Sequence, residues 1–302
     1  MPRNKKFVGD MTQIGNQRKP PFAQLPNALF EDRSLRFERL ASINPAKDYL
    51  EFLQNFTQKQ AETEKHFKTI SFDGVIETDN IASSVPRVNS TKLIESTIFS
   101  QISQDLFLRF EQMTLPESAK TALTFVKNDE AESKKIAHDL IKREIKSDRL
   151  AHSIFVLGAL QVAMTLATTH LDVKALKKQE GNLCPACGGT HSSSMVVGWS
   201  DAEGARFCSC LYCGTLWNYV RVKCTFCEST GGITYREIEG GPGTITAECC
   251  DNCGSYCKQM NHEKDVNFDA FADDIGSLAL DLLLQKDGKY HRGAFNPFMI
   301  GL

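Results

Sequence analysis

The sequence predicts an α+β protein, with an N-terminal all-α helical bundle, two tandem metal-binding β modules and a C-terminal helix. Three observations lead to this prediction. All 11 cysteines lie between Cys184 and Cys257, whereas residues 1–183 contain none. Apolar residues before Cys184 recur at helical spacing, and the same spacing returns over residues 265–285. With 302 residues, of which 41% are hydrophobic, the chain can bury a core of its own.

The change in cysteine content divides the chain into five predicted parts. Residues 1–25 form a flexible basic tail, and residues 26–183 form a helical domain. Residues 184–222 and 223–262 form the two β modules, and residues 263–302 form the C-terminal helix and tail. The segment from Cys184 to Cys257 has four Lys and Arg residues against seven Asp and Glu residues, a net charge of −3. This acidity argues against nucleic-acid binding, which needs clustered Lys and Arg.

Within residues 26–183, three stretches carry helical apolar stripes and a fourth is apolar throughout. Asn44-Pro45 is typical of a helix start, and Ser90 is a candidate cap for a second helix. Pro116 interrupts the pattern and predicts a new start. We expect about five or six helices packed as a bundle. The stripes comprise Tyr49, Leu53, Phe56 and Gln60; Ile94, Ile98, Ile102 and Leu106; and Ile136, Leu140, Ile141 and Ile145.

The apolar stretch, residues 150–171, carries no formal charge and is long enough to span a bilayer. It nevertheless contains polar residues such as His152 and Gln161, and a helix apolar on all sides also suits the centre of a bundle. We therefore expect a buried helix and no membrane insertion. The first 25 residues lack the apolar run of a signal peptide. We expect a cytoplasmic protein, in which closely spaced cysteines indicate metal binding rather than disulfides.

The cysteines form an internal repeat. Four Cys-x-x-Cys pairs occur, with 22 residues between the first and second pairs and again 22 between the third and fourth. Adding 40 to each position of the first two pairs gives the last two, as expected for a duplicated metal-binding module. The alternative pairing, in which the first and third pairs share an ion, also remains open. Sequential pairing puts Cys184, Cys187, Cys210 and Cys213 around one ion, and Cys224, Cys227, Cys250 and Cys253 around another.

Each Cys-x-x-Cys pair predicts a tight turn that points two sulfurs at one ion. Gly188, Gly214 and Gly254 follow three of the pairs and suit a left-handed backbone, whereas Glu228 follows the third pair. Short strands at residues 194–197, 205–207, 233–235 and 244–246 would carry these turns. The pattern is that of a tetrahedral four-sulfur site of rubredoxin or zinc-ribbon type. Four thiolates leave no open coordination position, so structural or electron-transfer roles are expected, and Lewis-acid hydrolysis is not.

Several residues of the cysteine region fall outside the repeat. Cys208, Cys249 and Cys257 are expected to be buried thiols. Trp199 and Trp217 are the only tryptophans, and we expect them to cover the sulfur sites. The seven histidines show no metal spacing with the cysteines and receive no role. No catalytic residue is predicted, because the helical half has no phosphate loop, nucleophile motif or paired His/Glu spacing.

The cysteine region also carries extended motifs around the pairs. Cys184-Pro-Ala-Cys187-Gly188 is followed by Arg206-Phe-Cys-Ser-Cys210-Leu-Tyr-Cys213, and Trp217 leads to Val220-Arg-Val-Lys-Cys224. Further motifs are Ala247-Glu248, Cys250-x-x-Cys253-Gly254-x-Tyr256-x-Lys258, Ala272-Asp-Asp274, Leu280-Asp281 and Asn296-Pro-Phe298. Together these motifs resemble the FdhE family of formate dehydrogenase accessory proteins. In the helical half the likeness is looser, and it is limited to stretches such as Asn44-Pro45 with Tyr49-Leu50.

This resemblance implies a cytoplasmic maturation factor that is not an enzyme. The family is needed for respiratory formate dehydrogenase to become active, and the implied partner is the catalytic subunit of that enzyme before its export. The resemblance makes the eight repeat cysteines ligands of two iron ions in rubredoxin-like sites, although four thiolates also suit zinc. It gives no oligomeric state.

The sequence departs from the family pattern at three positions, and two other functional classes are compared with the accessory role. Asn218 stands where family members commonly have His, and Cys208 and Cys257 replace residues that are usually not cysteine. One other class is a zinc-ribbon protein that binds nucleic acid, which the acidic charge disfavours. The other is a rubredoxin-like electron carrier, which would not need so large a helical domain.

Overall fold

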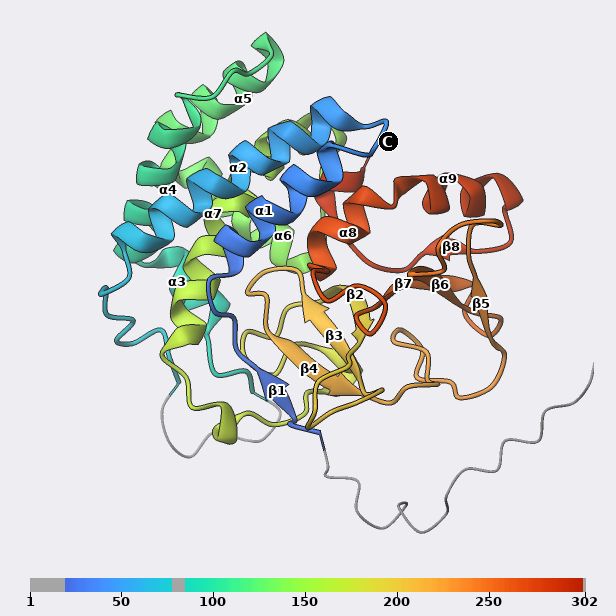
Figure 1. Ribbon diagram of the computed structural model, residues 1–302. Coiled ribbons are helices and arrows are strands. Elements are labelled where there is room, and N and C mark those ends of the chain that lie inside the picture. Colours follow the sequence, from blue (N-terminus) through green and yellow to red (C-terminus); the bar gives the residue numbers. More distant parts are fainter. Residues whose placement is uncertain (1–19, 78–84, 301–302) are drawn as a thin grey trace, which may run out of the picture.

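The computed structural model describes residues 20–77 and 85–300. Helices from the N-terminal half pack beside a single mixed β-sheet; of the two C-terminal helices, α8 (Ala270–Gly276) lies next to α1 and α9 (Leu278–Asp287) lies beyond it, beside β8 (His291–Arg292) (Figure 1). The helices of the N-terminal half are α1 (Leu29–Ala41), α2 (Lys47–His66), α3 (Ser90–Glu95), α4 (Thr97–Phe110), α5 (Glu117–Asn128), α6 (Glu130–Lys142) and α7 (Leu150–Thr169). The described part of this half thus contains seven α-helices, where the sequence predicted about five or six.

Helix α7 is the centre of the bundle and packs against α2, α4, α5 and α6. The segment Ser147–Thr169 is long and apolar enough to cross a membrane by length and composition, but 78% of its most apolar 18-residue stretch is buried inside the protein. The expected buried helix is therefore confirmed. Gly158 lets Phe56 of α2 approach closely, since a Cβ there would lie 2.5 Å from the ring atom Cζ. Beside this contact, the buried side-chain amide of Gln60 donates a hydrogen bond from Nε2 to Oε1 of Gln161 at 3.0 Å.

A single predicted helix over Ile94–Leu106 is in fact two helices. Asn89, and not Ser90, caps α3 by accepting a hydrogen bond from the backbone N–H of Lys92. The chain then leaves helical geometry at Ser96, whose hydroxyl accepts from the backbone N–H of Phe99 and caps α4. The apolar stripe runs across this break, because two helices separated by one residue can still bury the same face.

The two β modules form one continuous sheet. Its strands are β1 (Ala23–Gln24), β2 (His191–Val196), β3 (Arg206–Cys210), β4 (Leu216–Tyr219), β5 (Ile233–Arg236), β6 (Ile245–Cys250), β7 (Ser255–Asn261) and β8 (His291–Arg292). The strand order is β1-β4-β3-β2-β7-β6-β5, and β8 pairs with β7. The predicted strands correspond to β2, β3, β5 and β6 with shifted ends, whereas β1, β4, β7 and β8 were not predicted. Parallel pairing of β2 with β7, in which Ser194 is opposite Gln259, joins the first module to the second.

Part of the predicted basic tail belongs to this sheet. Ala23 and Gln24 form β1, which pairs with β4 so that Ala23 lies opposite Trp217. The backbone N–H of Asn218 also donates to the carbonyl of Phe22 at 2.8 Å. The prediction of a tail over residues 1–25 is therefore wrong for its last residues. Residues 1–19 lie outside the described part of the chain.

The predicted C-terminal helix is broken into α8 (Ala270–Gly276) and α9 (Leu278–Asp287). Because the break shifts the helical phase, α9 buries Leu280 and Leu284, while Leu282 is exposed. Helix α8 packs on α1, where Arg33 Nε lies 3.1 Å from Asp269 Oδ1. The C-terminal segment therefore packs on the helical domain.

Candidate metal centres

The structure gathers the eight repeat cysteines into two groups of four. Within each group, all four sulfurs lie within 4.8 Å of one another. The groups follow the sequential pairing, so that each copy of the repeat builds its own group. They consist of Cys184, Cys187, Cys210 and Cys213, and of Cys224, Cys227, Cys250 and Cys253.

The sulfur spacing suits a tetrahedral ion. In the first group, Cys184 Sγ lies 3.7 Å from Cys213 Sγ, and Cys187 Sγ lies 3.5 Å from Cys210 Sγ. The two corresponding distances in the second group are both 3.7 Å. A tetrahedron with metal–sulfur bonds of about 2.3 Å has edges of about 3.8 Å, whereas a disulfide needs sulfurs about 2 Å apart. The donor set therefore fits a four-thiolate metal site.

The backbone turns at the pairs are those that the sequence predicted. Gly188, Gly214 and Gly254 have φ values of 72°, 70° and 69°, and Glu228 takes the same left-handed conformation at 62°. In each turn the backbone N–H of this residue donates to the carbonyl of the first cysteine of the pair, as Gly188 does to Cys184 at 2.9 Å. This arrangement leaves both side chains of a pair on the same side of the turn.

Hydrogen bonds to the sulfurs favour the thiolate and oppose burial, although burial on balance keeps the pKa of Cys224 and of Cys250 above the usual cysteine value. The backbone N–H groups of Phe226 and Cys227 point at Cys224 Sγ from 3.4 and 3.5 Å, and the Thr215 hydroxyl lies 3.1 Å from Cys213 Sγ. Burial alone would raise the pKa of Cys253, but hydrogen bonds from Ser255 and from the neighbouring thiols lower that pKa to about 7. Such donors stabilise the negative charge that a metal ligand must carry.

The first group lies at the junction with the helical domain. Tyr212, between Cys210 and Cys213, donates its hydroxyl to the Leu140 carbonyl of α6 at 2.7 Å. Gln161 of α7 donates to the Leu211 carbonyl at 2.9 Å. In the turn of Cys184 and Cys187, the carbonyl of Ala186 accepts a hydrogen bond from the backbone N–H of Val88, also at 2.9 Å. Both turns of the first group are thus bonded to segments of the helical domain.

The second group lies near the chain's C-terminal end. Its second turn contacts the segment of β8, where Tyr290 donates its hydroxyl to Asp251 at 2.7 Å and Lys289 Nζ lies 2.9 Å from the same carboxylate. The backbone N–H of His291 donates to the Gly254 carbonyl at 2.9 Å. In contrast to the first group, Cys227 is exposed and Cys253 is half-buried.

A buried aromatic contact between the two groups was missed by the sequence reasoning. The His191 ring lies in β2, opposite Cys210 in the register, and stacks on Phe226 with ring centroids 5.0 Å apart. Phe226 lies between Cys224 and Cys227 of the second group. Burial lowers the pKa of His191 to about 3, so the ring is neutral. No spacing signal could reveal this residue, because its partner lies 35 positions along the chain.

The remaining predictions for this region have mixed outcomes. Cys208, Cys249 and Cys257 are buried as expected. Burial raises the pKa of Cys208 and Cys249 to about 11 and that of Cys257 to about 12, which keeps all three protonated. Trp217 belongs to the core cluster that contains the first group. Trp199 instead packs on Phe207 in a separate cluster without cysteines, so the expectation that it covers a sulfur site is wrong.

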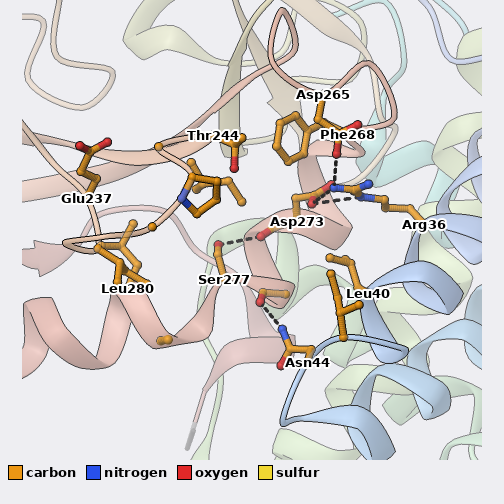
Figure 2. A pocket seen from close by; sticks show the side chains of 18 residues that line it. Arg36, Leu40, Asn44, Glu237, Thr244, Asp265, Phe268, Asp273, Ser277 and Leu280 are labelled. Atoms are coloured by element: carbon orange, nitrogen blue, oxygen red, sulfur yellow. Dashed lines mark hydrogen bonds and ion pairs between the residues drawn. The ribbon is translucent and has the colours of Figure 1, made fainter.

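A groove of about 440 Å³ lies away from the sulfurs, between α1, the β5–β6 loop and α8 (Figure 2). Its walls are mainly apolar and include Leu40, Phe268 and Leu280. Two of its carboxylates share one guanidinium, since Arg36 Nη2 lies 2.6 Å from Asp273 and 3.0 Å from Asp265. These ion pairs fix the position of α8 on α1 and do not form a nucleophile–base pair.

Comparison with known proteins gives matches along nearly the whole described chain. Residues 20–180 match the family described as FdhE, N-terminal; residues 183–221 match FdhE, central domain; and residues 222–299 match FdhE, C-terminal domain. A protein of Rhizobium meliloti (strain 1021) named Protein FdhE homolog is 36% identical over 301 residues, 97% of each chain. Protein FdhE of Escherichia coli O9:H4 (strain HS) is 30% identical and covers 93% of this chain and 91% of its own.

A solved structure shares the fold. The crystal structure of the FdhE protein from Pseudomonas aeruginosa aligns with a TM-score of 0.78 and 26% sequence identity. The alignment covers 93% of this chain and 99% of the other.

Proposed function

The chain belongs to the FdhE family, known for formate dehydrogenase accessory proteins, and we propose that it is a cytoplasmic maturation factor for respiratory formate dehydrogenase. In this proposal it binds the catalytic subunit of that enzyme before export and is not itself an enzyme. The family match over nearly the whole described chain supports the accessory role, and the two groups of four sulfurs support metal binding.

We further propose that the eight repeat cysteines are the ligands of two metal ions, one in each group. Four protein thiolates occupy all four coordination positions of a tetrahedral ion, so no position remains for water or substrate. The chemistry that such a group supplies when bound is structural or, with iron, one-electron redox chemistry. We favour iron because of the family resemblance, since the donor set suits zinc equally. The thiolates hold the ion, and the backbone N–H groups of Phe226 and Cys227 stabilise the sulfur charge.

The proposal predicts a complex with the catalytic subunit. The test is an anaerobic pull-down of the tagged protein from a formate-respiring host, with bound proteins identified by mass spectrometry. The catalytic subunit should be recovered with the unaltered chain and lost with Cys210→Ser/Cys213→Ser. The matched control is Cys208→Ala, which removes a buried cysteine outside the groups and should retain the subunit. Recovery of nucleic acid or of a redox reductase in its place would contradict the accessory role.

Deletion of the gene provides an independent test. Respiratory formate dehydrogenase activity should be lost and should return when the unaltered gene is supplied. A deletion strain with full activity would refute the accessory function. For the metal, anaerobically purified protein should contain two irons per chain and become coloured on mild oxidation. Colourless protein with two zinc ions per chain would refute iron and leave the ligand assignment intact.

A further inference from the structure

The two four-cysteine groups differ in their access to solvent. All four cysteines of the first group are buried, with exposed fractions between 0 and 4%. In the second group Cys224 and Cys250 are buried, but Cys227 is exposed and Cys253 is half-buried. Two copies of one repeat therefore place the same four sulfurs in different surroundings.

The cover over the first group is part of the protein core. The Tyr212 ring lies between the group and α6, where its hydroxyl is bonded to Leu140. A Cβ added at Gly189 would lie 2.3 Å from Tyr212 Cδ2 and 3.2 Å from Cys210 Sγ, so the ring packs directly on this turn. At the corresponding position of the second copy, Asn252 replaces Tyr212 and is exposed. Reaching the first group requires the packed junction with the helical domain to open.

The described residues cover the second group except at Cys227. In the turn of Cys224 and Cys227, the Tyr219 hydroxyl donates to the Cys224 carbonyl at 3.0 Å and Phe226 stacks on His191, so these contacts leave only the Cys227 end open. The β8 segment covers the turn of Cys250 and Cys253 through Asp251 and Gly254. The turn of Cys224 and Cys227 continues into Glu228, which is exposed like Cys227. A small hydrophilic molecule can therefore approach the Cys227 sulfur without disturbing the core.

We propose that the second site, at Cys224, Cys227, Cys250 and Cys253, exchanges its metal ion with solution. The first site keeps its ion permanently and thereby stabilises the junction with the helical domain. This inference rests on the proposed assignment of the eight cysteines as metal ligands. In the exchange, an incoming chelating ligand binds the ion at its Cys227 side as the metal–sulfur bonds break. Each released thiolate takes a proton from water, the ion leaves as the chelate, and no electron is transferred.

The test is the time course of zinc loss from protein reconstituted with two zinc ions per chain. Excess EDTA is added, the chelate is removed by gel filtration at intervals, and protein-bound zinc is counted by mass spectrometry. We expect two phases of one ion each, with the fast phase at least about tenfold faster, because loss from the first site needs local unfolding. Cys227→Ser should bind one ion, which leaves with the slow rate. Cys249→Ala, which alters a neighbouring cysteine outside the group, should keep both phases.

Alkylation provides a measurement that needs no variant. Brief treatment of the protein carrying two zinc ions with EDTA and iodoacetamide together, followed by peptide mapping, should modify Cys227 first and Cys184 and Cys213 at least about tenfold more slowly. Equal release rates for both ions, or a fast phase that persists in Cys227→Ser, would overturn the inference. A protein that fails to take up two ions at the outset would instead refute the ligand assignment, so the two failures are distinguishable.

Discussion

Arg206 of β3 reaches across the sheet to Glu248 of β6, where Nη1 and Oε2 lie 2.8 Å apart with both side chains buried. Strands β2 and β7 lie between them in the strand order, and Arg206 Nε also donates to Ser194 of β2 at 3.2 Å. The same guanidinium donates to the Lys223 carbonyl in the connection between the modules at 3.1 Å. One side chain therefore bonds the first module, the connection and the second module together.

Replacing Arg206 should destabilise the whole sheet. Arg206→Met leaves the Glu248 carboxylate buried without its partner, and breaking such a pair costs about 3–5 kcal/mol. Burial already raises the pKa of Glu248, and the loss of Arg206 raises that pKa further. The folded variant then binds a proton that the unfolded chain releases, so its stability should fall as pH rises above the usual glutamate pKa. Urea unfolding between pH 5 and 8 measures both effects.

Arg221→Met is the control for this experiment. Arg221 lies in the same connection and is exposed. Its side chain donates to the Gly204 carbonyl at 3.2 Å, and only its backbone carbonyl, which the substitution retains, accepts from Arg206. It should change the free energy of unfolding by less than about 0.5 kcal/mol. Equal losses in the two variants would show that the buried pair has no special role.

Gly189 should be intolerant of any side chain. A Cβ at this position would lie 2.3 Å from the buried Tyr212 ring, so Gly189→Ala should cost about 1–3 kcal/mol by overpacking. The duplicated copy supplies the matched position, where Ser229 is tolerated. Ser229→Gly should cost less than about 1 kcal/mol, because the hydrogen bonds that its hydroxyl makes with Gly231 and Asn252 are exposed to solvent. Thermal unfolding of both variants, with metal content measured in parallel, compares the two positions.

Glu228 is expected to be improved by glycine. It adopts a φ of 62°, which costs a residue with a Cβ roughly 1 kcal/mol. Glu228→Gly should therefore raise the free energy of unfolding by about 0.5 kcal/mol, after the loss of its half-exposed ion pair with Lys223. Glu228→Gln keeps the strained backbone and loses only the charge, so it should not stabilise. A gain of the same size in both variants would exclude backbone strain as the cause.

Glu64 should make the stability of the helical domain depend on pH. Burial, together with the nearby Glu31 carboxylate, raises the pKa of Glu64 to about 7. Because the folded protein then binds more protons than the unfolded chain between about pH 4.5 and 7, wild-type stability falls as pH rises through this window. Glu64→Gln removes the effect and should become relatively more stable, by on the order of 2 kcal/mol above pH 7. The measurement is urea unfolding at several pH values.

The control on the same helix is Glu51→Gln. Glu51 is half-exposed and lies 3.6 Å from Lys47 across one helical turn. Its difference from wild type should stay below about 0.5 kcal/mol at every pH. A pH-independent difference for Glu64→Gln would refute the burial argument.

The two sulfur groups could be predicted because their signal is local. Two intervening residues set the geometry of each turn, and the interval of 22 residues, which occurs twice, pairs the first turn with the second and the third with the fourth. The positive φ values at Gly188, Gly214 and Gly254 follow from the same local pattern. The burial of α7 was predictable for a similar reason, since its composition excludes a solvent-facing side.

The fusion of the two modules could not be predicted, because its determinants lie far apart in the sequence. Strand β7 carries Lys258, which is buried and would argue against a central strand. Its charge is met by Asp281 of α9 at 2.5 Å and by Asp274 of α8 at 3.2 Å, which only the folded chain brings together. The break at Ser277 between those helices was missed because the apolar residues on both sides continue the helical spacing.

The parallel pairing of β2 with β7 has a consequence for the newly made chain on the ribosome. Ser194 cannot pair with Gln259, its partner in the register, until 65 further residues have been synthesised. At bacterial elongation rates of about 5–20 residues per second, one edge of β2 stays open for roughly 3–13 s. During that interval only antiparallel pairs can form, namely those among β1, β2, β3 and β4 and that of β5 with β6. The order of translation thus lets the first half of the sheet form early, with the β7 side of β2 unpaired until β7 has been synthesised.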